Sequence, residues 1–156
     1  MKKTIVTALT LLGLHASLAI ASDERVVVPN HEPTSKACTD CHMLFPPQML
    51  PKASWEKIMN SLDNHFGENA TLDEATRKQV SDFLQANSGD SGSRRNHHFL
   101  RGMRAGDVPL RITETPYWQR EHKKEVSPEA FARPEVKSAA NCPACHKRAS
   151  EGYYED

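Results

Sequence analysis

The chain has 156 residues, of which 38% are hydrophobic, 6% aromatic and 26% charged, with 20 basic and 20 acidic side chains. A formal charge of zero and an isoelectric point near 7.1 argue against a nucleic-acid-binding protein and against a polybasic membrane-surface protein. A mean hydropathy of -0.63 indicates a thin apolar core, so we expect another group to help fill it. Four cysteines and eight histidines suggest the chemistry of that group.

Residues 1–21 have the pattern of a cleaved secretory signal peptide. Lys2 and Lys3 form a short positive start, an apolar run covers 5–20, and Ala21 ends a small-x-small cleavage site. The run is too short to span a membrane comfortably, and no stop-transfer pattern follows, although an uncleaved anchor is the alternative. Without the two lysines, 18 basic and 20 acidic residues remain, a net charge of -2. We expect a soluble periplasmic protein whose mature form has no membrane span.

All four cysteines lie in two motifs of the same form. Each reads C-x-x-C-H, the attachment motif of c-type haem, and the two are Cys38-Thr39-Asp40-Cys41-His42 and Cys142-Pro143-Ala144-Cys145-His146. In that chemistry both thiols add to vinyl groups of one porphyrin, and the adjacent histidine ligates the iron from the proximal side. The sequence therefore predicts two covalently bound haem c groups, with His42 and His146 as the proximal ligands.

Three other interpretations of the cysteine motifs account for the sequence less well than haem attachment. A zinc site would have to close across about 100 residues, which is far longer than zinc-ribbon spacings. Disulfides suit an exported chain but do not explain a histidine after each second cysteine. A thioredoxin-like site needs a βαβ context, and the sequence has almost no strand pattern.

The motifs divide the chain into two predicted lobes. Residues 22–88 form an N-terminal haem lobe, 89–96 a flexible linker rich in serine and glycine, and 97–156 a C-terminal haem lobe. We expect an all-α fold of two small helical lobes with long loops, each packed around one haem.

In the first lobe, a stiff proline-rich loop follows His42 and two helices follow the loop. The first helix is predicted to begin at the N-cap Ser54 and to end at Gly67. Its apolar face carries Trp55, Ile58, Met59, Leu62 and Phe66, with His65 beside them. The second helix is predicted to begin at the capping residue Thr71.

In the second lobe, residues 111–114 are predicted to be briefly extended. Thr115 then caps a short helix with Pro116 at its first position. Trp118 and His122 are four residues apart on this helix and share a face. Another short helix is predicted to begin at Ser127 and Pro128 and to stop before Pro134.

The sixth iron ligand decides whether a haem only transfers electrons or also binds small molecules. In the first lobe, His65 is the predicted distal ligand, because it is a polar residue on an apolar face after the attachment motif. His31, in a proline-flanked loop, is the rival, and Met49 and Met59 are weaker candidates.

In the second lobe almost nothing follows His146, so the distal ligand must precede it. His122 is the predicted ligand, because it lies on the Trp118 face. The alternatives are His97 and His98, just after the linker, and Met103. Histidine on both faces of each iron would give a fairly low reduction potential, since the methionine that raises it is absent.

Several strings beyond the cysteine motifs resemble the bacterial dihaem cytochrome c family. They cover roughly residues 38–150 and are Cys38-Thr39-Asp40-Cys41-His42-Met43-Leu44-Phe45-Pro46-Pro47-Gln48-Met49-Leu50-Pro51, Ser54-Trp55, His65-Phe66-Gly67-Glu68-Asn69-Ala70, Arg111-Ile112-Thr113-Glu114-Thr115-Pro116, Arg120-Glu121-His122 and Asn141-Cys142-Pro143-Ala144-Cys145-His146. The resemblance implies a periplasmic electron carrier with two bis-histidine, low-potential haems. Some members take electrons from the membrane, through a b-type cytochrome, and pass them to a small oxygen-binding, high-spin cytochrome c.

The sequence thus favours a single-electron carrier rather than an enzyme. The alternative is a peroxidase or small-oxide reductase with one open haem, although no clear catalytic acid or base adjoins either motif. A sensor or a module of a larger redox complex is a third class, and it would require a separate partner protein.

Overall fold

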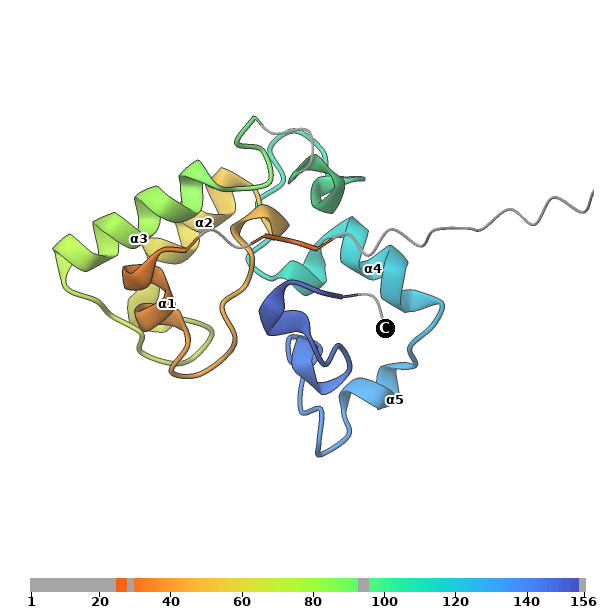
Figure 1. Ribbon diagram of the computed structural model, residues 1–156. Coiled ribbons are helices and arrows are strands. Elements are labelled where there is room, and N and C mark those ends of the chain that lie inside the picture. The colour runs from red at the N-terminus through yellow and green to blue at the C-terminus, as the bar shows by residue number, and fades with distance from the viewer. Residues whose placement is uncertain (1–24, 28–29, 93–95, 155–156) are drawn as a thin grey trace, which may run out of the picture.

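The regular elements of the computed structural model are helices, in two groups (Figure 1). The structure describes residues 25–27, 30–92 and 96–154, so the predicted signal peptide and the centre of the predicted linker lie outside it. The longer elements are α1 (Glu32–Cys38), α2 (Lys52–Met59), α3 (Glu74–Ala86), α4 (Pro116–Lys123) and α5 (Pro128–Phe131). Short 3-10 turns are η1 (Pro47–Met49), η2 (Leu62–Asn64), η3 (Asn96–Leu100), η4 (Ile112–Glu114), η5 (Cys142–Ala144) and η6 (Ala149–Glu151). The predicted all-α fold of two helical lobes is confirmed.

The apolar core of the first lobe lies mainly between α2 and α3. Its buried members are Leu50, Trp55, Ile58, Met59, Leu62, Val80 and Leu84. The proline-rich loop is fastened to this core, because the indole Nε1 of Trp55 donates a buried hydrogen bond of 2.7 Å to the carbonyl of Pro47. The loop therefore has a fixed position as it leads away from the first cysteine motif.

The prediction that one helix continues to Phe66 is wrong. α2 ends at Met59, and the chain continues through the separate turn η2. The hydroxyl of Ser61 donates a hydrogen bond of 2.9 Å to the carbonyl of Lys57, which competes with continuation of the helix. His65 consequently lies in a loop rather than on a helix.

Two predicted helix caps are also wrong. Ser54 is buried inside α2, which begins directly after Pro51. Thr71 caps no helix, because α3 begins at Glu74 and its N-cap is Asp73. There the Asp73 carboxylate accepts a hydrogen bond of 3.0 Å from the backbone N–H of Thr76. Both errors arise because several residues near each boundary are good caps, and packing selects among them.

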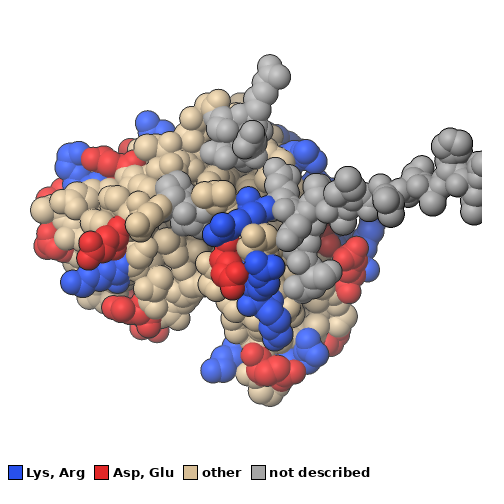
Figure 2. Space-filling model, in the orientation of Figure 1, with Lys and Arg blue, Asp and Glu red and all other residues tan. Residues whose placement is uncertain are grey.

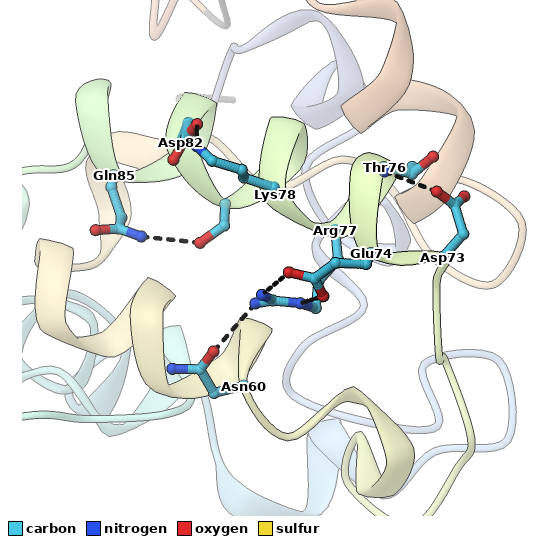
Figure 3. A network of polar contacts seen from close by, with 9 residues as sticks. Asn60, Asp73, Glu74, Thr76, Arg77, Lys78, Asp82 and Gln85 are labelled. Carbon is cyan, nitrogen blue, oxygen red and sulfur yellow. Dashed lines mark hydrogen bonds and ion pairs between the residues drawn. The ribbon is translucent and has the colours of Figure 1, made fainter.

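Polar side chains on α3 connect it to the end of α2 (Figure 3). The Arg77 guanidinium donates two hydrogen bonds, of 2.8 and 2.7 Å, to Glu74 and a third of 3.1 Å to Asn60, the C-cap of α2. Lys78 and Asp82 form an exposed ion pair farther along α3. Exposed pairs contribute up to about 1 kcal/mol each, so apolar packing remains the main attachment between these helices.

The second lobe has much less apolar core. The buried hydrophobic residues in this part of the described chain are Phe99, Val136 and Ala149. Neither α4 nor α5 contains a buried residue. A lobe this thin requires another apolar body to pack against, as the low mean hydropathy of the whole chain predicts.

Residues 25–27 connect the C-terminal tail to the first lobe. The backbone N–H of Val26 donates a hydrogen bond of 2.8 Å to the carbonyl of Gly152. Gln48, in the proline-rich loop, donates one of 2.8 Å to the carbonyl of Val27. The lobes also meet where Leu110 and Ile112 pack against the α2–α3 core.

The surface mixes both signs of charge. On the face in Figure 2, basic and acidic side chains are interspersed over both lobes, and a notch separates the lobes at the lower edge. Among the described residues, no helix is long and apolar enough to span a membrane.

We expect Gly152→Ala to weaken the contact between residues 25–27 and the C-terminal tail. Gly152 has φ +91°, and an added Cβ would collide with the backbone carbonyl of Val26. Gly106 also has φ +91° but no neighbour within 4 Å, so Gly106→Ala is the matched control. Chemical unfolding should show a loss of about 2–3 kcal/mol for Gly152→Ala and about 1 kcal/mol for Gly106→Ala. Equal losses would contradict the proposed collision.

Candidate haem-binding sites

The N-terminal site begins where α1 ends. Cys38 is the last residue of α1 and is half-buried, whereas Cys41 is exposed, and neither forms a disulfide. Burial raises the pKa of the Cys38 thiol to about 11, as an apolar environment requires. The ring of His42 follows, with its centre 6.2 Å from the ring centre of His65.

A tight turn presents His65 to His42. The backbone N–H of His65 donates 2.7 Å to the carbonyl of Glu68, and the N–H of Glu68 donates 3.2 Å in return. The two residues between them, Phe66 and Gly67, have φ +57° and +104°, the signs that a type I′ turn requires. Phenylalanine is a costly residue in this conformation, by about 1–2 kcal/mol, so its ring is expected to have a role.

The environment of His65 favours the neutral imidazole, the form that binds a metal. Burial lowers the pKa of His65, and the nearby His42 and Arg111 lower it further. These residues come from both sides of the predicted linker, so the site depends on the contact between the lobes.

Backbone carbonyls fix the orientation of two of the four rings. Nδ1 of His42 lies 2.7 Å from the carbonyl oxygen of Met43, and Nδ1 of His122 lies 2.9 Å from that of Trp118. A carbonyl can only accept a hydrogen bond, so Nδ1 carries the proton in each ring. This leaves Nε2 with the free lone pair that a metal ion needs.

The C-terminal site combines α4 with the second cysteine motif. Residues 142–144 form η5, and the N–H of His146 donates a hydrogen bond of 2.8 Å to the carbonyl of Cys142, so that both cysteines and the histidine line one cavity. The ring centre of His122, on α4, lies 6.0 Å from that of His146. Trp118 stacks on His122 with ring centres 4.2 Å apart and an angle of 13°, as the predicted shared face requires.

A cavity of about 200 Å³ that opens to solvent lies between these elements. It is lined by Trp118, His122, Val126, Phe131, Val136, Ser138, Ala139, Asn141, Cys142, Cys145 and His146. Tyr154 lies against the same region, with its ring centre 5.9 Å from that of His146, and burial raises its phenol pKa. The cavity thus has largely apolar walls, two thiols and two facing imidazoles.

Both sites fit a covalently attached haem. Two imidazoles on opposite sides of one metal ion have ring centres about 6 Å apart, because each metal–nitrogen bond is about 2 Å long and the ring centre lies about 1 Å beyond. The observed separations are 6.2 Å for His42 and His65 and 6.0 Å for His122 and His146. Each pair adjoins two free cysteines.

The rival ligands in the first lobe lie in other surroundings. The ring of His31 stacks on Phe83 with centres 4.3 Å apart, and its Nδ1 is 2.7 Å from the hydroxyl of Thr34. Met49 and Met59 are buried among apolar residues, with 7% and 4% of their surfaces exposed.

The rivals in the second lobe lie in or near η3. His97 is exposed, whereas His98 packs against Phe99 and Tyr117, with ring centres 3.8 and 5.6 Å away. Met103 is half-buried just beyond η3. The ring contacts of His122, in contrast, join it to His146.

The family model described as dihaem cytochrome c matches residues 34–154. This chain belongs to the dihaem cytochrome c family. A dihaem cytochrome c from Rhodobacter sphaeroides is 43% identical with a TM-score of 0.75, covering 81% of this chain and 98% of that chain. A second structure from that organism is 39% identical with a TM-score of 0.67, covering 81% and 99%. A dihaem cytochrome c from Shewanella baltica is 26% identical with a TM-score of 0.65, covering 82% and 89%.

A search of curated proteins gives no match. As a dihaem cytochrome c, the protein carries two covalently bound c-type haems with iron, and its family supports a haem electron-carrier role.

The sequence interpretation missed two residues beside His65. The apolar spacing predicts Phe66 on a buried helix face, yet it is 45% exposed, and the guanidinium carbon of Arg111 lies 4.0 Å from its ring centre. The Phe66-Gly67 pair is a turn signal, because glycine favours positive φ, but the apolar spacing before it suggested a helix. The contact with Arg111 has no sequence signal, because the two residues are far apart in the chain.

We expect Thr115→Ala to destabilise α4, the helix that carries Trp118 and His122. The buried hydroxyl of Thr115 accepts a hydrogen bond of 3.2 Å from the N–H of Trp118 and donates one of 2.8 Å to the carbonyl of Ile112. Chemical unfolding should show a loss of about 1 kcal/mol, with recovery in Thr115→Ser. Thr71→Ala is the control, since Thr71 caps no helix, and an equal loss there would contradict this role.

Proposed function

We propose that this cytochrome is a periplasmic carrier of single electrons in which His42 and His65 ligate one iron and His122 and His146 the other. The observation that carries the proposal is the pairing of each motif histidine with a second imidazole at the separation one metal ion requires. A residue held on each face leaves no iron position open for oxygen, peroxide or a small oxide.

The bound haems supply one-electron chemistry at iron, and the protein orients the side chains that hold the iron. His42 and His122 are held by carbonyl hydrogen bonds, so their Nε2 atoms keep one orientation whether or not an electron is present. Trp118 and Phe131 pack beside His122, with ring centres 4.2 and 6.4 Å away, and limit its movement. Fixed ligands favour fast electron exchange because little has to rearrange.

The proposed route runs from a membrane b-type cytochrome, through this protein, to a high-spin oxygen-binding cytochrome c. The resemblance of the sequence to its family supports both partners, and the signal-peptide pattern of residues 1–21 supports a periplasmic location. Bis-histidine ligation suits this order, because a low potential allows the carrier to reduce an acceptor of higher potential.

His65→Ala and His122→Ala should each convert one haem from low spin to high spin without loss of covalent attachment. Each variant removes one proposed ligand and leaves both cysteines in place. Optical and electron paramagnetic resonance (EPR) spectra measure the spin states, and mass spectrometry counts the attached haems. His31→Ala and His97→Ala are the controls and should keep two low-spin haems. A low-spin pair in His65→Ala or His122→Ala would show that the ligand lies elsewhere.

Carbon monoxide provides a direct test against a haem enzyme. The reduced wild-type protein should bind it slowly or not at all, because both sixth positions are occupied. Rapid binding to one haem of the untreated protein would contradict the carrier and support an enzyme with an open site.

A further inference from the structure

One short segment of the second lobe contacts both elements that carry the proposed distal histidines. At one end, Arg111 lies over Phe66, the neighbour of His65. At the other end, Thr115 caps α4, which carries His122. The prediction that 111–114 is extended is wrong beyond Arg111, because η4 covers the next three residues.

The backbone of Arg111 has a fixed position. Its N–H and that of Leu110 each lie 3.2 Å from the Glu114 carboxylate, which accepts both hydrogen bonds. The N–H of Glu114 donates 3.0 Å back to the carbonyl of Arg111. Leu110 and Ile112 pack against the α2–α3 core, so the segment is held against the first lobe on both sides of Arg111.

The side chain of Arg111 reaches His65 through the ring of Phe66. Its guanidinium carbon is 4.0 Å from the centre of the Phe66 ring, within the range of a cation–π contact. The ring centre of His65 is 4.7 Å from the same point, in an edge-to-face arrangement. The positive charge can therefore be no farther from the His65 ring than the sum of these two distances.

The charge of Arg111 is only partly balanced. Nε lies 3.9 Å from Oε1 of Glu114, which is beyond hydrogen-bond distance, and both side chains are about half exposed. The same charge contributes to the lowered pKa of His65, after burial and His42. His122 has different surroundings, since the aromatic rings that contact it in the described structure are Trp118, Phe131 and His146.

We propose that Arg111, which lies over Phe66 beside His65, raises the reduction potential of the N-terminal haem above the value that ligation alone would give. The inference rests on the proposed function, because it requires His65 to ligate iron. A nearby positive charge favours the reduced state, which carries one positive charge fewer than the oxidised state. The N-terminal haem thereby holds an electron more readily than it would without Arg111.

The test measures both reduction potentials in Arg111→Gln and Arg111→Lys by optical redox titration. Arg111→Gln should shift the reduction equilibrium of one haem about threefold to tenfold toward the oxidised form, a fall of about 30–60 mV for one electron. Arg111→Lys retains the charge and should recover most of the shift. Lys78→Gln, which removes an exposed charge from α3, is the control and should leave both potentials near their wild-type values. The haem that shifts should be the one that becomes high spin in His65→Ala.

Three results would overturn the inference: potentials in Arg111→Gln that match the control, a shift in the C-terminal haem instead, or equal shifts in Arg111→Gln and Arg111→Lys. Loss of a low-spin haem in Arg111→Gln would also overturn it, because Arg111 would then be needed for ligation rather than for potential. All of these are distinguishable from failure of the proposed function, which would appear as a high-spin or rapidly carbon-monoxide-binding haem in the wild-type protein.

Discussion

The structure depends on two pairs of facing imidazoles. Each pair joins the end of a cysteine motif to a distant element: His42 to the turn that carries His65, and His146 to the helix that carries His122. The second pair matters more for folding, because α4 and α5 bury no residue of their own. In the proposed arrangement, a covalent haem held between these elements would supply the apolar body that the lobe otherwise lacks, which would explain how so hydrophilic a chain forms a compact structure.

The two lobes are joined as parts of one redox unit rather than connected by a linker alone. Residues 25–27 bind the C-terminal tail and the proline-rich loop together, and the segment around Arg111 packs on the first lobe while it begins the helix of the second. These contacts fix the position of one site relative to the other. Electron transfer falls steeply with separation, so a constant geometry between the haems is a functional requirement.

One of the two described non-glycine residues with positive φ, Phe66, lies beside a proposed ligand. Phe66 adopts positive φ and is 45% exposed, both of which are unfavourable for a large apolar residue. The turn that imposes this conformation presents His65 to His42, and the exposed ring receives the guanidinium of Arg111. The strain at Phe66 therefore accompanies the positioning of the proposed ligand His65 and of a positive charge near it. Strained residues are often found at functional sites.

The sequence by itself determined the chemistry, because covalent attachment requires two thiols and a histidine at a fixed local spacing that any fold must preserve. It also determined the helix capped by Thr115, where the cap, the proline and the pairing of Trp118 with His122 are all local signals. It did not determine where α2 ends, because the helical spacing of apolar residues continues to Phe66. The hydroxyl of Ser61, which bonds to the carbonyl of Lys57, favours an earlier end. Only the tertiary structure decided that His65 lies in a turn and that Arg111 approaches it, because that contact depends on how two distant segments pack.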